Sequence, residues 1–154
     1  MTKGIPEGMH TVTPVLCLDG ASEAIELYKK AFGAQERGIA LDPSGKKVLH
    51  AAIAIGDSTV FLNDPFPEMG ALAQPSKLWL YFEDVGKAFK RASEAGMKVL
   101  MPPADMFWGD RYGRVGDRWG NEWGMAQRTA DLTPEQMKAA EKVFMAQMAA
   151  QKKK

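Results

Sequence analysis

The order of predicted elements repeats along the chain, and this repeat constrains the fold more than any single motif does. Alternating and helical apolar patterns predict strand 11–18, helix 21–32, strands 35–41, 46–55 and 58–63, then strand 77–82, helix 83–95, strand 97–101, a hairpin over 107–115 and strand 121–128. Gly33 and Gly96, which end the two helices, are 63 residues apart, and Val15 and Trp79 in the two first strands are 64 apart. The pattern therefore indicates an α+β fold built from two tandem βαβββ modules, at about 11–64 and 76–128.

Two further segments lie outside the repeat. Residues 64–75 are rich in proline and glycine and predict a linker or flap. Thr133, Pro134 and Gln136 have the spacing of a capping box, which predicts a helix at about 133–150. Its apolar stripe (Met137, Ala140, Phe144 and Met148) is expected to pack on the body of the domain, with a dimer contact as the alternative.

Composition and charge exclude several classes of protein. The 154 residues, 45% of them hydrophobic, predict one domain over 1–154 with a proper core. A formal net charge of +1 gives no indication of a nucleic-acid partner, and no apolar run is long enough for a membrane span. The first nine residues do not read as a signal peptide, and the single cysteine, Cys17, cannot form an internal disulfide. The expected compartment is therefore the cytoplasm.

Strand alternation predicts which side chains share a face. In strand 46–55, Leu49, Ile53 and Ile55 are expected to pack under a helix, which leaves His50 on the other face. The opposite, cleft-lining face is predicted to hold small residues together with polar and aromatic ones: Thr13, Cys17, His50, Ala52, Ala54, Lys77, Trp79, Tyr81, Glu122 and Gly124. Small residues on a concave face leave room for a ligand, and aromatic side chains line most small-molecule pockets. Each of these residues also has a purely structural interpretation: His50 as a hydrogen-bonded strand residue, Cys17 as a small apolar residue, and Trp79 and Tyr81 as core.

The stretch FWGDRYGRVGDRWGNEW, residues 107–123, concentrates aromatic and charged residues between glycines. Gly109 and Gly113 flank Asp110 and Arg111, so this charged pair is held in a sharp bend, either as an ion pair that locks the loop or as a binding edge. Arg111 could meet an anionic group, or Asp110 could lock the loop by pairing with Arg111 or Arg114. The Asp117–Gly120 segment predicts a turn.

The two βαβββ units, with EAIELYKKAFGA in the first and GDRWGNEW closing the second, resemble the vicinal oxygen chelate superfamily of glyoxalases, bleomycin-resistance proteins and extradiol dioxygenases. The segments VLHAAIAIGDSTVFLND, FEDV and AGMKVLMPPADMFWGDRYG are similar to its PhnB-like branch. The resemblance covers about residues 10–128. It implies a cleft between the modules, a homodimer, and a small-molecule ligand. The WGDRYG stretch is part of the signature of this branch, which implies that Trp108, Asp110 and Arg111 line the cleft. No glycine-rich nucleotide loop supports the methyltransferase activity that some members of the branch are named for.

The resemblance also implies where enzymes of the superfamily hold a divalent metal. Carried over by strand and helix spacing, those positions are Thr13 and Val60 in the first module and Lys77 and Gly124 in the second. None has an imidazole or carboxylate side chain, so we expect no bound metal and no cofactor. If the register slips, His10, His50 and Glu122 become the candidate metal ligands.

Three functions remain open at the level of sequence. The first is metal-free binding of a small, partly aromatic or apolar molecule, expected to be anionic because Lys77 and Arg111 lack an assigned partner. The second is a metal-dependent lyase, isomerase or dioxygenase. The third is a metal-free enzyme that uses His50 as its acid or base.

Overall fold

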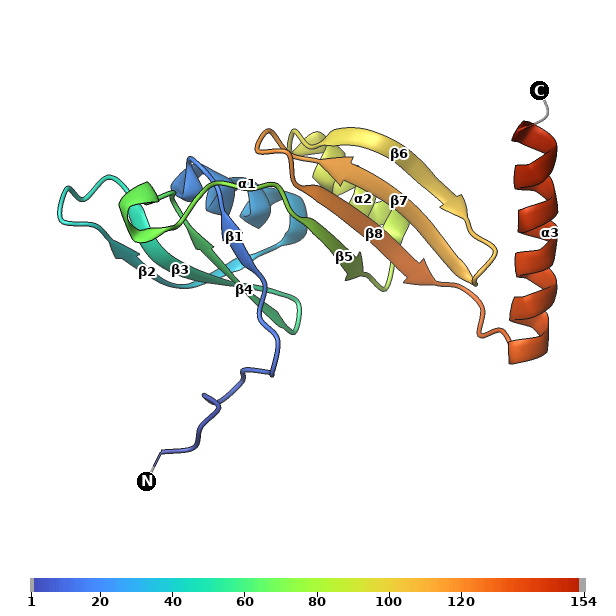
Figure 1. Cartoon of the computed structure of the whole chain (residues 1–154), viewed down its shortest axis with the longest axis horizontal. Helices are drawn as coiled ribbons and strands as arrows, with labels where there is room; N and C mark the ends of the chain where they lie inside the picture. The colour runs from blue at the N-terminus through green and yellow to red at the C-terminus, as the bar shows by residue number, and fades with distance from the viewer. Residues whose placement is uncertain (1, 153–154) are drawn as a thin grey trace.

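The computed structural model describes residues 2–152 and consists of two four-stranded sheets and three α-helices (Figure 1). The first module contains β1 (Val15–Cys17), α1 (Ala21–Phe32), β2 (Gln35–Leu41), β3 (Val48–Ile55) and β4 (Ser58–Asn63), with sheet order β1-β4-β3-β2. The second contains β5 (Lys77–Tyr81), α2 (Val85–Glu94), β6 (Lys98–Asp105), β7 (Asp110–Gly116) and β8 (Glu122–Arg128), with order β5-β8-β7-β6. The same strand order in both halves confirms the predicted repeat of βαβββ modules in an α+β fold.

Each module closes on itself through one parallel strand pair. β1 pairs in parallel with β4, and β5 with β8, while the remaining neighbours are antiparallel. The parallel pair needs a crossover, which α1 and α2 provide. In Figure 1 the two sheets lie side by side with α1 and α2 behind them, so each sheet has one helix-covered face and one open face.

The core lies between the helices and the covered sheet faces. Ile25 and Tyr28 of α1 are buried, as are Leu16, Ile53 and Leu62 on the strands of the first module. This core continues into the second module, where the ring of Trp123 lies 4.9 Å from Tyr28 and 4.8 Å from Phe32 between centroids. The two modules therefore share one core rather than folding around two separate ones.

Two predictions about strand faces are wrong. Leu49 was expected under a helix but is 42% exposed, because a β-bulge opposite Ala40 and Leu41 shifts the register and buries Val48 in its place. Val60 was carried over as a cleft position but is buried on the helix side, whereas its neighbours Thr59 and Phe61 face the open side. Val15 pairs with Phe61 in the first module, and Trp79 pairs with Gly124 in the second. Gly124 therefore corresponds to Phe61 and not to Val60, so the offset between the last strands of the two modules is one residue shorter than predicted.

The helix ends combine local and distant signals. Gly33 ends α1 in the left-handed region, as predicted, with its N–H donated to the carbonyl of Lys29. The start of α1 has no local side-chain cap; Asp64, at the end of β4, accepts hydrogen bonds from the backbone N–H groups of Gly20 (2.9 Å) and Ala21 (3.0 Å). Gln127 accepts the N–H of Val85 at 3.0 Å in the second module. The end of each last strand thus fixes the start of its own module's helix.

Elsewhere the structure refines the predicted boundaries. The glycine-rich stretch expected to form a hairpin over 107–115 is instead one strand, β7, paired with β6 and β8. The segment 64–75 contains a 3-10 turn at Pro67–Met69 and an isolated bridge between Phe66 and Ala71. The Asp117–Gly120 turn forms as predicted, with the N–H of Gly120 donated to the carbonyl of Asp117 at 3.2 Å.

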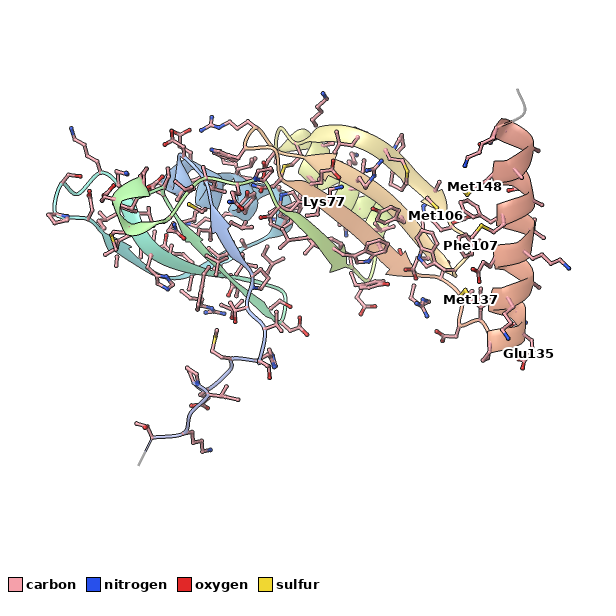
Figure 2. All side chains as sticks on the ribbon, viewed as in Figure 1. Lys77, Met106, Phe107, Glu135, Met137 and Met148 are labelled. Carbon is pink, nitrogen blue, oxygen red and sulfur yellow. The ribbon has the colours of Figure 1, made fainter. Side chains whose placement is uncertain are left out.

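The C-terminal helix α3 (Pro134–Lys152) stands apart at one end of the second sheet (Figure 1). Its capping box forms, since the backbone N–H of Gln136 reaches the hydroxyl of Thr133 at 3.1 Å. No residue of the helix within the described part of the chain is buried, so the expected packing on the body is not found. Phe144 of the helix stacks on Phe107, with 4.7 Å between centroids, and both rings line a pocket of about 540 Å³. Figure 2 shows Met106 and Phe107 at the end of the sheet that faces α3.

No helix within residues 2–152 is both long enough and apolar enough to cross a membrane.

Candidate functional site

Four aromatic side chains gather on the open face of the second module. Trp79 and Tyr112 are stacked, with 4.3 Å between centroids and 10° between planes. Tyr81 and Trp108 each lie 6.1 Å from Trp79. We call Trp79, Tyr81, Trp108 and Tyr112 the aromatic platform. Trp79 is 45% and Tyr81 58% exposed, so large apolar rings remain open to a ligand.

The platform depends on the absence of a side chain at Gly124. Tyr112 stands on β7 and Trp79 on β5, with β8 between them, and Gly124 is paired with Trp79. A Cβ at Gly124 would lie 2.9 Å from Cε2 of Tyr112 and 3.5 Å from Cε3 of Trp79. Gly124 therefore lets the tyrosine ring lie across β8 and reach the tryptophan.

A buried carboxylate holds the platform in place from one end. Asp110, with no exposed surface, accepts hydrogen bonds from the hydroxyl of Tyr81 (2.8 Å) and from Nε1 of Trp108 (2.8 Å). Nε of Arg128 donates to its other oxygen at 2.7 Å. The expected lock at Asp110 therefore exists, but its cation is Arg128 rather than Arg111 or Arg114. Asp110 is therefore structural: its carboxylate fixes two of the four rings, Tyr81 and Trp108, and its charge is neutralised by Arg128.

The surroundings of Asp110 predict a pH-dependent stability. Burial raises the pKa of Asp110, but hydrogen bonds from Arg128, Tyr81 and Trp108 outweigh it and leave the pKa below its ordinary 3.8. A carboxyl whose pKa is lower in the folded chain stabilises it fully above the unfolded pKa, and this contribution disappears as the pH falls toward the folded pKa. Asp110→Asn should therefore cost on the order of 2 kcal/mol at pH 7 and progressively less below about pH 4.

Urea unfolding of the wild type and of Asp110→Asn at pH 7, 5, 4 and 3 measures this difference. A gap that stays constant over the whole range would show that the charge of Asp110 does not contribute.

A pocket of about 270 Å³ lies at the junction of the modules, beside the platform. Trp79 and Leu78 line it from the second module, and His10, Thr13 and Thr59 from the first. This pocket therefore brings Thr13 and Trp79, predicted cleft residues of the two modules, together within a single chain.

The other predicted first-module residues lie on a different sheet from the platform. His50 on β3 faces Phe61, 4.6 Å between centroids. Cys17 on β1 accepts a hydrogen bond from Nδ2 of Asn63 at 3.3 Å, and burial raises the pKa of its thiol, which disfavours a nucleophilic role. Within one chain, His50 and Cys17 thus belong to the open face of the first module and not to the aromatic platform.

The cations expected to attract an anion both have carboxylate partners. Nζ of Lys77 lies 3.7 Å from Oε2 of Glu122, and Arg111 lies 3.4 Å from Oδ1 of Asp105. Arg111 also lies between Asp110 and Tyr112 in β7, so strand alternation directs it to the side opposite the platform. The argument for an anionic ligand from unpaired Lys77 and Arg111 therefore loses its basis.

The residues at the superfamily's metal positions do not fit a metal ion. Val60 is buried on the helix side, Lys77 is a cation, and the place beside Gly124 is taken by Tyr112 and Trp79. Over residues 2–152 no three His, Cys, Asp or Glu side chains come close enough together to form a metal centre. His10, His50 and Glu122, the alternative ligands, are not brought together.

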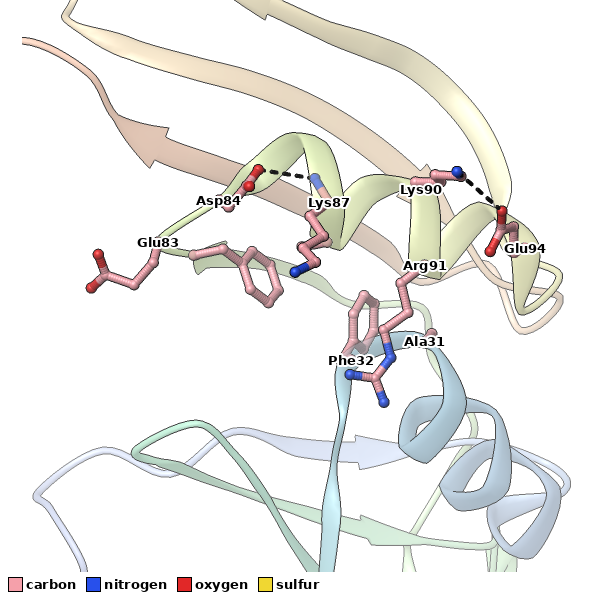
Figure 3. Close-up of a pocket in the computed structure, with 10 residues that line it drawn as sticks. Ala31, Phe32, Glu83, Asp84, Lys87, Lys90, Arg91 and Glu94 are labelled. Carbon is pink, nitrogen blue, oxygen red and sulfur yellow. Dashed lines mark hydrogen bonds and ion pairs between the residues drawn. The ribbon is translucent and has the colours of Figure 1, made fainter.

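Another pocket, of about 560 Å³, lies between α1 and α2 on the helix side (Figure 3). None of the four platform residues lines it. Phe32 and Phe82 line it together with acidic and basic residues: Glu83, Asp84, Lys87, Lys90, Arg91 and Glu94. Arg91 is already engaged there, because its Nε donates to the carbonyl of Lys30 at 2.8 Å. We interpret this groove as the packing boundary between α1 and α2, since its lining residues do not form a catalytic or metal-binding cluster.

Three residues of the site were not predicted from the sequence. Tyr112 completes the aromatic platform, Arg128 neutralises Asp110, and Arg114 approaches Oε2 of Glu122 at 3.5 Å. Alternation within β7 would have placed Tyr112 and Arg114 on one face, but the expected hairpin break at Gly113 hid that pattern.

Comparison with known proteins agrees with this architecture. Residues 9–125 match the Glyoxalase/Bleomycin resistance protein/Dioxygenase superfamily. The uncharacterized protein Mb0911c of Mycobacterium bovis is 38% identical over 138 residues, which cover 84% of this chain and 90% of that protein.

Two solved structures share the fold. TnmS3, an antibiotic binding protein from Streptomyces sp. CB03234, has a TM-score of 0.59 at 24% identity, covering 79% of this chain and 97% of its own. The PhnB protein of Bacillus cereus has a TM-score of 0.56 at 17% identity, covering 77% and 99%. The family match over most of the chain and the repeated βαβββ modules together show that this chain belongs to the glyoxalase/bleomycin resistance protein/dioxygenase superfamily.

Proposed function

We propose that this chain is a metal-free binding protein for a small planar, aromatic or largely apolar molecule. The observation that carries the proposal is the aromatic platform, whose half-exposed rings are fixed by Asp110 and by the stack over Gly124. Rigid, pre-positioned aromatic rings bind planar molecules with little loss of conformational entropy. The adjoining junction pocket offers room for the part of the ligand that reaches past Trp79.

Two further arguments favour binding over catalysis. The residues at the metal positions cannot form the divalent site that the superfamily's enzymes use. The ring of His50, the candidate acid or base of the sequence analysis, lies edge-on against Phe61 at 4.6 Å between centroids, an apolar neighbour that orients neither ring nitrogen. The fold itself is compatible with binding, since TnmS3 is described as an antibiotic binding protein. A PhnB-like assignment within the superfamily is part of the same proposal.

The protein is proposed to act as a homodimer in a reducing compartment such as the cytoplasm. Val143 and Met145 of α3 are 59% and 54% exposed, and the open faces of both sheets carry exposed apolar side chains. The free thiol of Cys17 agrees with a reducing environment. Light scattering across micromolar concentrations should give the mass of two chains, and a monomer mass throughout would reject the dimer.

Binding of 2-naphthol and of its saturated analogue, decahydro-2-naphthol, tests the proposed function. The two molecules have the same skeleton, but only the first is planar and aromatic. By isothermal titration calorimetry, 2-naphthol should bind at least about tenfold more tightly, because stacking on aromatic side chains contributes about 1–3 kcal/mol per ring system. Equal affinities would remove the planar, aromatic part of the proposal, and no binding of either molecule would overturn it.

A further inference from the structure

One charged cluster beside the platform is not balanced. Lys77, Glu122 and Arg114 stand on the adjacent strands β5, β8 and β7. Nζ of Lys77 (3.7 Å) and NH1 of Arg114 (3.5 Å) both approach the same atom, Oε2 of Glu122. Two cations therefore share one carboxylate oxygen, and one positive charge within this trio has no counterpart.

Within residues 2–152, the other arginines near the site, unlike Arg114, do not share a carboxylate with a second cation. Arg128 lies between two carboxylates, Asp110 at 2.7 Å and Asp131 at 3.4 Å, and Arg111 has Asp105 to itself. The side chains of Arg114 and Glu122 are only 39% and 33% exposed, so water screens them less than it would a fully exposed pair. The side chain of Lys77 is 81% exposed, so the less screened of the two positive charges is that of Arg114.

Arg114 lies within electrostatic range of the platform itself. It is two residues from Tyr112 on β7, which puts both side chains on the open face, and it pairs in register with Gly124. Burial raises the pKa of Tyr112, and in addition Arg114 lowers it and Glu122 raises it, as expected of charges close to the phenol. A ligand that lies on the Trp79–Tyr112 stack would therefore have its edge near the guanidinium.

We propose that Arg114, assisted by Lys77, binds a carboxylate or similar anionic substituent on the planar ligand of the platform. This inference rests on the proposed function and names the chemical class of its ligand. The guanidinium can offer a two-pronged contact to a carboxylate, whereas its present contact with Glu122 is long and single. Arg114 thus takes the role of anion-binding cation that the sequence suggested for Arg111, because Arg111 lies on the opposite side of β7.

The test compares 2-naphthoate with 2-naphthamide, which have nearly the same shape and differ in charge. Wild-type protein should bind the carboxylate at least about tenfold more tightly than the amide. Arg114→Gln should remove most of that preference and leave the affinity for the amide unchanged, and Lys77→Gln should reduce the preference in part. Arg111→Gln, a substitution of the same kind on the other side of β7, should change neither affinity.

The outcomes separate this inference from the proposed function. If both probes bind the wild type equally, or if Arg114→Gln keeps the full preference, the anion site is wrong while aromatic binding stands. If neither probe binds, both proposals fail. The circular dichroism spectrum of each variant checks that it is folded. If Arg114→Gln does not fold, the reduced preference of Lys77→Gln for the carboxylate still tests the anion site.

Discussion

Replacing Asp117 with alanine is expected to lower the free energy of unfolding by about 3–5 kcal/mol, because it breaks a buried hydrogen-bond network. One carboxylate oxygen of Asp117 accepts from the hydroxyl of Tyr28 (2.7 Å) and from Nε1 of Trp123 (3.0 Å). The other accepts from the backbone N–H groups of Trp119 and Asn121, both at 3.0 Å. Tyr28 and Trp123 are fully buried, so alanine would leave the two donors, the hydroxyl of Tyr28 and Nε1 of Trp123, without an acceptor and without water.

The effect should be large because Asp117 connects the two modules. Tyr28 belongs to α1 of the first module, whereas Asp117 lies in the turn between β7 and β8 of the second. The matched control is Asp57→Ala in the corresponding turn of the first module. Within the described residues, the carboxylate of Asp57 accepts a single hydrogen bond, from the hydroxyl of Ser58 at 3.0 Å. That substitution should cost no more than about 0.5 kcal/mol. Urea unfolding that gives similar costs for both variants would contradict the role assigned to Asp117.

Replacing Trp79 with alanine is expected to abolish the binding of planar aromatic ligands. Trp79 contacts all three other members of the aromatic platform and also lines the junction pocket. Its removal takes away both the stacking surface and the support of Tyr112. We expect a loss of affinity for 2-naphthol of at least about 100-fold, in the range found when central aromatic anchors of binding sites are truncated.

Trp119→Phe is the control for this substitution. Trp119 is another tryptophan, but it packs edge-on against Tyr28 on the helix side and donates to the carbonyl of Asp19 at 2.7 Å. Its replacement should leave ligand affinity unchanged even if the melting temperature falls. Thermal-shift titrations with 2-naphthol would show the contrast, and an equal ligand-induced rise in Trp79→Ala and wild type would place the binding elsewhere.

The sequence by itself determined the modules and most of their elements. Apolar periodicity located both crossover helices, and Gly33 and Thr133 marked helix ends where the structure has them. These signals are local: a side-chain period, a left-handed glycine or a capping pair depends on residues within one turn of each other. Alternation is equally local: it put Trp79 and Tyr81 on one face of their strand, and both side chains are exposed in the structure.

Features that depend on contacts between two elements could not be predicted from the sequence. The bulge that exposes Leu49 depends on how β3 pairs with β2, and α1 is capped by Asp64 from the end of β4 rather than by a neighbouring residue. The separation of His50 from Trp79, which alternation had assigned to one cleft, follows from their positions in two different sheets.

Only the tertiary structure decided what the charged and aromatic residues of 107–123 do. Asp110 takes Arg128 as its partner because β7 and β8 pair Asp110 directly with Arg128, across a distance that no local spacing reveals. Asp117 draws one of its donors, the hydroxyl of Tyr28, from α1, and Gly124 matters because Tyr112 crosses it to reach Trp79. Backbone conformation is governed by short-range sterics and hydrogen bonds, whereas the partner of a carboxylate and the space beside a glycine are set by strand register and by the packing of distant segments.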